Sequence, residues 1–149
     1  MRSVLMAISI ALLLIAPASA SDAGVFSRVE RFIDAWNRND AAGVTDCMSA
    51  SPTIIDDFPP HYWSGSSALV DWGKDYAILM NENDITDPRV MLSRPTIIDV
   101  HGTKAYVVVP ATYSYKQHAR PMQEKGILTV ALEGSHQGWR ITAFAWTKQ

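Results

Sequence analysis

Two adjacent carboxylates, Asp56 and Asp57, follow a short β-prone run and precede a pair of prolines. Because side chains alternate across a strand, only one of the two can face a cavity, while the other can cap the bend before Pro59. We favour Asp56 as the inward residue. An inward carboxylate can act as a general base, whereas a turn-forming aspartate only accepts backbone hydrogen bonds, and the sequence leaves both roles open.

A histidine and two tyrosines could complete an acid/base site with these carboxylates. His61 can exchange a proton near neutral pH, although an exposed surface histidine is the favoured interpretation. Tyr113 and Tyr115 share one face of a later strand, where an inward hydroxyl could polarise a carbonyl group and an outward one would be a surface tyrosine. The candidate catalytic residues are therefore Asp56, Asp57, His61 and Tyr113.

Aromatic side chains supply candidate contacts for an apolar ligand. Trp72 and Tyr76 lie four residues apart at helical spacing, so they share one helix face, either to fill the core or to stack on a ligand. The full set of predicted ligand-binding residues is Trp36, Trp63, Trp72, Tyr76, Tyr115 and Trp146.

The sequence contains no local motif for metal, phosphate or nucleotide chemistry. His101, His118 and His136 fall in or beside predicted turns and are interpreted as exposed loop histidines rather than as zinc ligands. Cys47, the only cysteine, is interpreted as a small buried hydrophobe and not as a nucleophile. We therefore expect neither a metal ion nor a cofactor.

Apolar spacing predicts helices in the first half of the chain, over residues 23–39, over 41–48, and from a start within 64–67 to Met80. In the first helix the apolar stripe includes Phe32 and Trp36, which we expect to be buried between this helix and a sheet.

The second half of the chain is rich in β-branched and aromatic residues and predicts strands over 90–99, 104–115, 122–132 and 139–147, after a short first strand at 53–55. Short polar links between them indicate an antiparallel meander. Helices followed by a sheet give an α+β fold, in which the sheet buries one face against the helices.

Alternation along the last two strands bears on a cavity between sheet and helices. Glu124 and Lys125 alternate along one strand, and a charge that enters the cavity would have to be paired, but the sequence does not show which way either side chain faces. Phe144 and Trp146 have the parity opposite to Ile141, and we expect this bulky pair to wall the cavity.

Three segments together resemble the nuclear transport factor 2-like superfamily, in its SnoaL-like polyketide cyclase branch. They are Val29-x-x-Phe32-x-x-x-Trp36-x-x-x-Asp40, residues 56–65 before the third helix, and the terminal segment 138–146. The resemblance implies N-terminal helices packed in a curved antiparallel sheet, forming a cystatin-like cone with a pocket. It also implies an acidic residue at the pocket mouth, where Asp56 and Asp57 fall.

Members of this superfamily include isomerases, dehydratases, cyclases, epoxide hydrolases and proteins without catalytic activity, so the fold does not determine the function. The sequence shows neither a clear second inward acid like that of the ketosteroid isomerases nor an Asp-Arg-Asp set like that of the epoxide hydrolases.

Residues 1–20 have the features of a signal peptide: Arg2, an apolar run over 4–16, and Ala18-Ser19-Ala20 before the cleavage point. The run is shorter than the roughly 20 residues that span a bilayer, and an uncleaved interfacial anchor is the alternative. We expect an exported bacterial protein, periplasmic or secreted, in which residues 21–149 form a single domain without a membrane anchor after processing. Removal of Arg2 leaves 12 basic against 15 acidic residues, which argues against nucleic acid as a partner.

The sequence therefore favours an exported domain that binds a small apolar molecule in an aromatic-lined pocket. The alternative is a cofactor-independent lyase or isomerase with an aspartate as general base. A homodimer formed through the open face of the sheet is a further expectation.

Overall fold

Three helices lie in residues 22–149, the part of the chain that the computed structural model describes: α1 (Asp22–Asn37), α2 (Ala41–Cys47) and α3 (Ala68–Glu82). These bounds lie close to the expected ones. The Asp40 side chain caps α2 by accepting a hydrogen bond of 2.9 Å from the backbone N–H of Gly43. The expected signal peptide lies outside the described residues. No helix within them is both long and apolar enough to cross a membrane.

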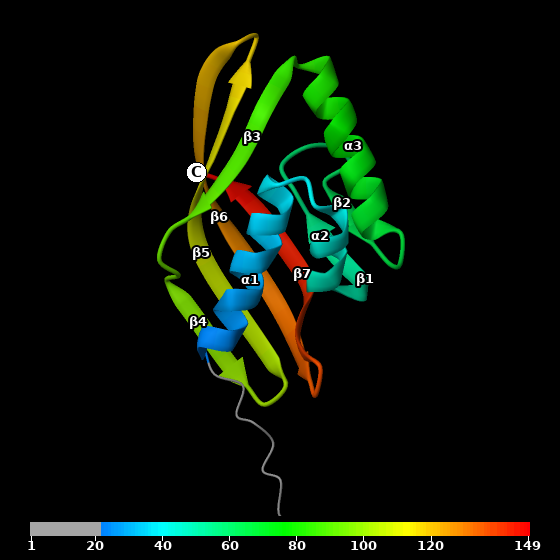
Figure 1. Cartoon of the computed structure of the whole chain (residues 1–149), viewed down its shortest axis with the longest axis vertical. Coiled ribbons are helices and arrows are strands. Elements are labelled where there is room, and N and C mark those ends of the chain that lie inside the picture. Colours follow the sequence, from blue (N-terminus) through cyan, green and yellow to red (C-terminus); the bar gives the residue numbers. More distant parts are fainter. Residues whose placement is uncertain (1–21) are drawn as a thin grey trace, which may run out of the picture.

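The strands form one curved sheet that stays open (Figure 1). Their order in space is β2-β1-β7-β6-β5-β3, and β4 also pairs with β5. All neighbours are antiparallel except β1 and β7, which run parallel. The mixed α+β class is confirmed. The strands are β1 (Met48–Ile55), β2 (Tyr62–Ser64), β3 (Ile85–Leu92), β4 (Ile97–His101), β5 (Lys104–Gln117), β6 (Arg120–Ser135) and β7 (Gly138–Lys148).

Two strand predictions were wrong in extent. The expected strand 90–99 is divided into β3 and β4 by residues 93–96, where Pro95 has no N–H for a ladder bond. Both halves pair with β5, one after the other along its length. The first strand begins five residues earlier than expected, at Met48, where it joins β7.

Helix α1 crosses one face of the sheet, and α3 lies alongside β1, β2 and β3 (Figure 1). Phe32 on α1 is 2% exposed and packs on Phe144 of β7, with ring centroids 5.3 Å apart. Trp36, one turn later, is only half-buried and faces Trp72 and Tyr76 of α3. The expectation of burial between helix and sheet therefore holds for Phe32 and was wrong for Trp36.

A β-bulge in β7 changes which side chains face the helices. Leu132 pairs with Ile141 and Ala131 with Ala143, so Thr142 is an extra residue on β7. The added residue reverses the alternation, and both Ile141 and Phe144 are buried. The expectation that Ile141 and Phe144 face opposite sides of the sheet was wrong because of this bulge.

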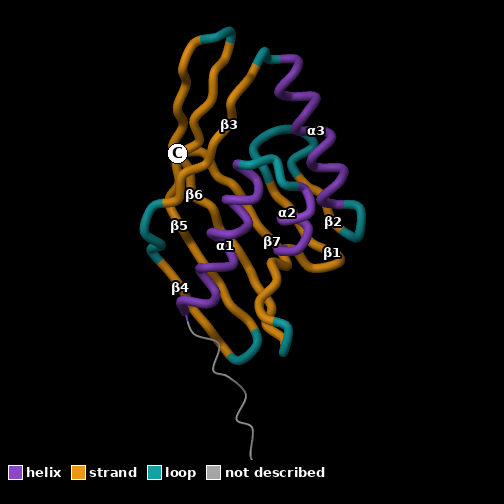
Figure 2. Tube along the Cα trace, viewed as in Figure 1, coloured by secondary structure: helices purple, strands orange, loops and turns teal. Residues whose placement is uncertain are grey.

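Two turns at the same end of the molecule are joined by hydrogen bonds (Figure 2). In the turn between β5 and β6, the backbone N–H of His118 donates to the carbonyl oxygen of Asp84, in the turn between α3 and β3, at 3.0 Å. The His118 ring also lies 3.2 Å from the Asp84 carboxylate. This contact ties the end of α3 to the far end of the long β5–β6 hairpin.

The last residue of α1 is bonded to the edge strand of the sheet. The side-chain amide of Asn37 donates to the carbonyl oxygen of Val90 at 2.8 Å, and the Val90 N–H donates back to the Asn37 side-chain oxygen at 2.9 Å. Since β3 is the end of the strand order, these two bonds satisfy backbone groups that point away from β5.

Candidate functional site

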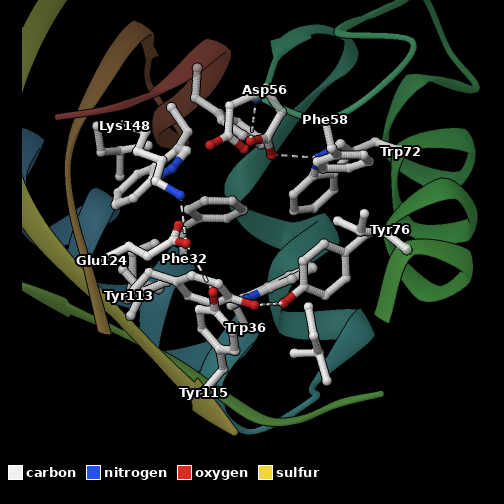
Figure 3. Close-up of a pocket in the computed structure, with 18 residues that line it drawn as sticks. Phe32, Trp36, Asp56, Phe58, Trp72, Tyr76, Tyr113, Tyr115, Glu124 and Lys148 are labelled. Atoms are coloured by element: carbon white, nitrogen blue, oxygen red, sulfur yellow. Dashed lines mark hydrogen bonds and ion pairs between the residues drawn. The ribbon is translucent and has the colours of Figure 1, made fainter. Parts of the chain in front are cut away.

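A cavity of about 270 Å³ opens between α1, α3 and the sheet (Figure 3). Nine of the chain's 14 aromatic residues line it, together with aliphatic and a few polar side chains. The lining residues are Phe32, Ile33, Trp36, Asp56, Asp57, Phe58, Trp72, Tyr76, Leu79, Ile85, Val90, Tyr113, Tyr115, Glu124, Leu128, Phe144, Trp146 and Lys148.

The Asp56 carboxylate lines the cavity and also accepts a hydrogen bond at the bend. One oxygen accepts a hydrogen bond of 2.9 Å from the Trp72 indole N–H inside the cavity, and the other accepts one of 2.9 Å from the backbone N–H of Asp57 at the bend. Burial raises its pKa to about 6; the two hydrogen bonds oppose this rise and the neighbouring Asp57 charge adds to it. Asp56 can therefore hold or release a proton near neutral pH.

Asp57 also lines the cavity, exposed at its rim, so the expectation that only one of the two carboxylates faces the cavity was wrong. Within residues 22–149, no lysine, arginine or histidine forms an ion pair with Asp56 or Asp57. When both are ionised, the two carboxylates therefore give this side of the cavity a negative charge that no ion pair within residues 22–149 neutralises, although the Lys148 charge interacts with Asp57.

Two tyrosine hydroxyl groups meet on the opposite side of the cavity. Tyr76 of α3 and Tyr113 of β5 share a hydrogen bond of 2.8 Å, and the Tyr113 hydroxyl also lies 3.7 Å from the sulfur of Met80. Burial raises the pKa of Tyr113 to about 12 and raises that of Tyr76 further. Both hydroxyls thus stay protonated. When Tyr76 donates to Tyr113, the Tyr113 proton can go to the Met80 sulfur, a weak acceptor, or to a ligand.

Glu124 faces the cavity, whereas Lys125 is exposed on the other side of β6. The Glu124 side chain is 20% exposed, and one of its oxygens accepts hydrogen bonds from the Tyr115 hydroxyl at 2.9 Å and from the Lys148 ammonium at 2.6 Å. The hydrogen bond from Lys148 to Glu124 raises the pKa of Lys148, and burial raises the pKa of Tyr115. Figure 3 shows Glu124 between its two partners.

Sequence reasoning missed Lys148, Phe58 and the inward direction of Glu124. The parity of Glu124 with Leu128 and Leu132, both buried, was the signal that could have placed it inward. No comparable signal marks Phe58, which lies in the loop between β1 and β2.

Five of the six predicted ligand-binding aromatic residues line the cavity. Trp36 lies 4.6 Å from Trp72 and 5.0 Å from Tyr76, as measured between ring centroids, and Tyr115 and Trp146 line the sheet side of the same cavity. These five residues thus reach the cavity from the helices α1 and α3 and from the strands β5 and β7.

Two expected site residues lie outside the cavity wall. His61 is exposed beyond the bend, where its ring nitrogen lies 3.1 Å from the backbone carbonyl oxygen of Asp56, not from the carboxylate. Trp63 is buried behind Phe58, with ring centroids 5.1 Å apart, and its indole N–H donates to Asp75 at 2.8 Å. Because the chain reverses between β1 and β2, these side chains are directed away, and Trp63 supports the wall only through Phe58.

Among the described residues, no group of three or more His, Cys, Asp or Glu side chains is arranged to hold a metal ion. Cys47 is 1% exposed, lies 3.9 Å from the guanidinium of Arg28, and is not among the residues that line the cavity.

One glycine shapes the sheet side of the cavity. A Cβ atom at Gly126 on β6 would overlap the indole ring of Trp146 on β7, lying 2.7 Å from its Cε2 atom. The two positions are diagonal neighbours across the strand pair, and the bare glycine lets the ring lie flat on the backbone. Trp146 therefore keeps its place in the wall only while residue 126 has no side chain.

We expect Gly126→Ala to lower the free energy of unfolding by about 1 to 3 kcal/mol, because the indole must shift in a packed wall. Gly73→Ala is the matched control, since nothing lies within 4 Å of the added methyl group in α3 and a helical alanine is favoured. Urea unfolding of both variants checks this. Equal stability of Gly126→Ala and the native protein would contradict the assigned ring position.

The family model for the SnoaL-like domain matches residues 25–144, which is most of the chain. The chain belongs to the SnoaL-like domain family. No protein with a curated function matches it in sequence. Solved structures with the same fold share little sequence with it, so they establish the fold alone.

A nuclear transport factor 2-like superfamily protein from Salmonella enterica serovar Typhimurium is 16% identical, with a TM-score of 0.71 over 85% of this chain and 89% of that one. A ketosteroid isomerase-like protein from Erwinia carotovora atroseptica is 15% identical, with a TM-score of 0.65 over 85% and 94%. The CaMKII hub of S. rosetta is 15% identical, with a TM-score of 0.71 over 90% and 100%.

Proposed function

We propose that this SnoaL-like domain binds a small, largely apolar organic molecule in the cavity between α1, α3 and the sheet. The observation that supports the proposal is the concentration of nine aromatic side chains around one space of about 270 Å³. Few polar groups interrupt these walls, and such a composition is typical of small-molecule sites.

A fluorescent apolar probe tests this proposal. We expect N-phenyl-1-naphthylamine to bind with enhanced, blue-shifted emission, and Trp36→Ala to weaken its binding at least about tenfold by removing one face of the wall. Tyr106→Ala, on an exposed β5 side chain outside the cavity, is the control and should bind as the native protein does. Absence of probe binding, or equal losses in both variants, would refute the assignment of this cavity as the site.

A second function, cofactor-independent proton transfer, is favoured by one arrangement. Asp56 has a pKa raised to about 6, and it shares the cavity with the neutral hydroxyls of Tyr76 and Tyr113. A carboxylate base and a hydrogen-bond donor within one apolar space are what enolisation of a carbonyl compound requires. The Erwinia neighbour, a ketosteroid isomerase-like protein, is consistent with such chemistry on this fold.

In this scheme the ionised Asp56 removes a proton from the carbon next to a carbonyl group of the ligand. The bonding electrons move to the carbonyl oxygen, where the Tyr113 hydroxyl donates a hydrogen bond to the growing negative charge. Asp56 then returns the proton to another carbon, which gives an isomer. Alternatively, the enolate electrons form a carbon–carbon double bond and expel a leaving group from the next carbon, and this group takes the proton from Asp56, which gives a lyase product. The aromatic walls limit water and keep the carboxylate basic.

Two further proposals concern export and self-association. We propose that residues 1–20 are removed on export, as the signal-like pattern of that segment suggests. We also propose that two copies pair through the outer face of the sheet, where exposed Tyr106 and Ile97 lie on neighbouring strands. Neither proposal affects the assignment of the cavity.

A further inference from the structure

The charges that line the cavity are unequal. Three carboxylates, those of Asp56, Asp57 and Glu124, stand against the single ammonium group of Lys148. Lys148 is already bonded to Glu124 at 2.6 Å, and the Tyr115 hydroxyl donates to the same oxygen. The Glu124 charge is therefore compensated within the protein.

Among residues 22–149, neither Asp56 nor Asp57 forms an ion pair, although the Lys148 charge also interacts with Asp57. The Asp56 carboxylate accepts two neutral hydrogen bonds, from the Trp72 indole and from the backbone of Asp57, and neither donor carries a charge. A half-buried carboxylate with only neutral donors keeps an unfavourable solvation energy, which a cation beside it would relieve.

The aromatic rings near Asp56 suit a cation as well. Trp72 directs its indole N–H edge at the carboxylate and is buried, so the ring that can meet a cation is that of the half-buried Trp36, 4.6 Å from Trp72 between ring centroids. Tryptophan faces attract ammonium groups more strongly than other side-chain rings do, and the attraction is larger where water is excluded. An anion would instead meet both the ring faces and the two uncompensated carboxylates.

We propose that the ligand of this cavity is an organic cation: an ammonium compound with apolar substituents, its charge beside Asp56 and its apolar part against the tryptophan rings. The inference rests on the proposed binding function and specifies the chemical class of the ligand. Glu124 and Lys148, on the sheet side, compensate each other and leave the cation to the Asp56 side.

Affinity for such a ligand depends on pH through Asp56, whose pKa is about 6. The titratable groups that face it are Asp57 on its own loop, Tyr76 of α3, Tyr113 and Tyr115 of β5, Glu124 of β6 and Lys148 of β7, while His61 reaches only its backbone oxygen. Because a cation favours the ionised carboxylate, the affinity rises as pH increases through about 6.

Three probes of the same shape separate charge from size: choline, the neutral 3,3-dimethylbutan-1-ol, and the anion 3,3-dimethylbutanoate. Each is titrated against bound N-phenyl-1-naphthylamine at pH 7.5 and pH 5.0. We expect choline to compete at least about tenfold more strongly than the alcohol at pH 7.5, the anion to compete least, and the choline advantage to shrink several-fold at pH 5.0.

Variants with a matched charge change complete the test. Asp56→Asn should remove most of the choline preference and its pH dependence, whereas Asp99→Asn, an exposed residue of β4 outside the cavity, should change neither. If the naphthylamine binds but the alcohol or the anion competes as well as choline, the cation inference is wrong and the apolar pocket stands. If the naphthylamine itself does not bind, the proposed function fails as well.

Discussion

Asp56→Asn is expected to lower the turnover of a carbonyl compound by about 10² to 10⁴, with little change in the affinity for an uncharged ligand. Asparagine keeps the size and planarity of the side chain and can still accept the hydrogen bond from Trp72, but it cannot take a proton. Steady-state kinetics with a substrate that the cavity binds would measure this loss. Full activity in both Asp56→Asn and Asp57→Asn would exclude the acid/base scheme.

The pH dependence provides an independent readout of the same residue. Only ionised Asp56 can act as a base, so kcat/KM should rise with pH through about 6 and level off above it. Stability should change in the opposite direction. The raised pKa means that the folded protein binds more protons than the unfolded chain between about pH 4 and pH 6, so native stability falls across this interval as pH rises.

The asparagine variant lacks this slope because it has no titratable group at position 56. Urea unfolding at pH 4.5 and 7.5 should therefore show a pH-dependent difference between the native protein and Asp56→Asn. At pH 7.5 the variant should be within about 1 kcal/mol of the native protein or more stable, since it no longer holds a charge in an apolar space. Lost activity would then not be a consequence of unfolding.

Trp72→Ala is expected to lower the free energy of unfolding by about 3 to 5 kcal/mol, the range for truncation of a large buried aromatic side chain. Trp72 is 5% exposed, packs against Trp36, Tyr76 and Phe144, and donates to Asp56. The alanine variant loses these ring contacts and leaves the Asp56 carboxylate without its indole donor. Chemical denaturation measures the change.

Trp72→Phe keeps an aromatic ring at this position but removes the indole N–H group, so it distinguishes the contributions of the two. We expect a smaller loss of about 1 to 3 kcal/mol, together with a further rise in the pKa of Asp56, because the indole hydrogen bond is one of the interactions that lower it. Trp36→Ala is a second comparison; Trp36 is only half-buried, so its loss should affect ligand binding more than stability. If Trp72→Ala is as stable as the native protein, the assigned packing is wrong.

Regular elements could be predicted from the sequence where one periodicity runs uninterrupted. The apolar stripe of α1 and the alternation in β5 and β6 each continue over many residues, so their bounds were close to those observed. Prediction failed where a single residue interrupts the period. Pro95 divides an expected strand, and the extra Thr142 reverses the alternation in β7.

Long-range pairing leaves no such pattern in the sequence. The parallel alignment of β1 with β7 joins segments about 90 residues apart, and nothing near either segment specifies it. The same limit applies to the site. Asp56, Trp72, Tyr76 and Tyr113 could be proposed from residue type and local spacing, but their hydrogen-bond partners could not.

The direction of individual side chains around the bend after β1 was also beyond local reasoning. His61 and Trp63 follow Asp56 closely in sequence, yet the chain reversal directs His61 to solvent and Trp63 behind Phe58. The inward direction of Glu124 could have been predicted from its parity with Leu128. Its pairing with Lys148 depends on the register between β6 and β7.

The pair of hydrogen bonds between Asn37 and Val90 also bears on self-association of the folded chain. An unprotected edge strand presents free N–H and C=O groups onto which a strand of another molecule can add, and growth by that route leads to fibrous aggregates. On β3, the Asn37 amide takes the place that the peptide group of an added strand would occupy at Val90. The end of α1 thus blocks strand addition at the middle of this edge, and it leaves the outer face of the sheet uncovered.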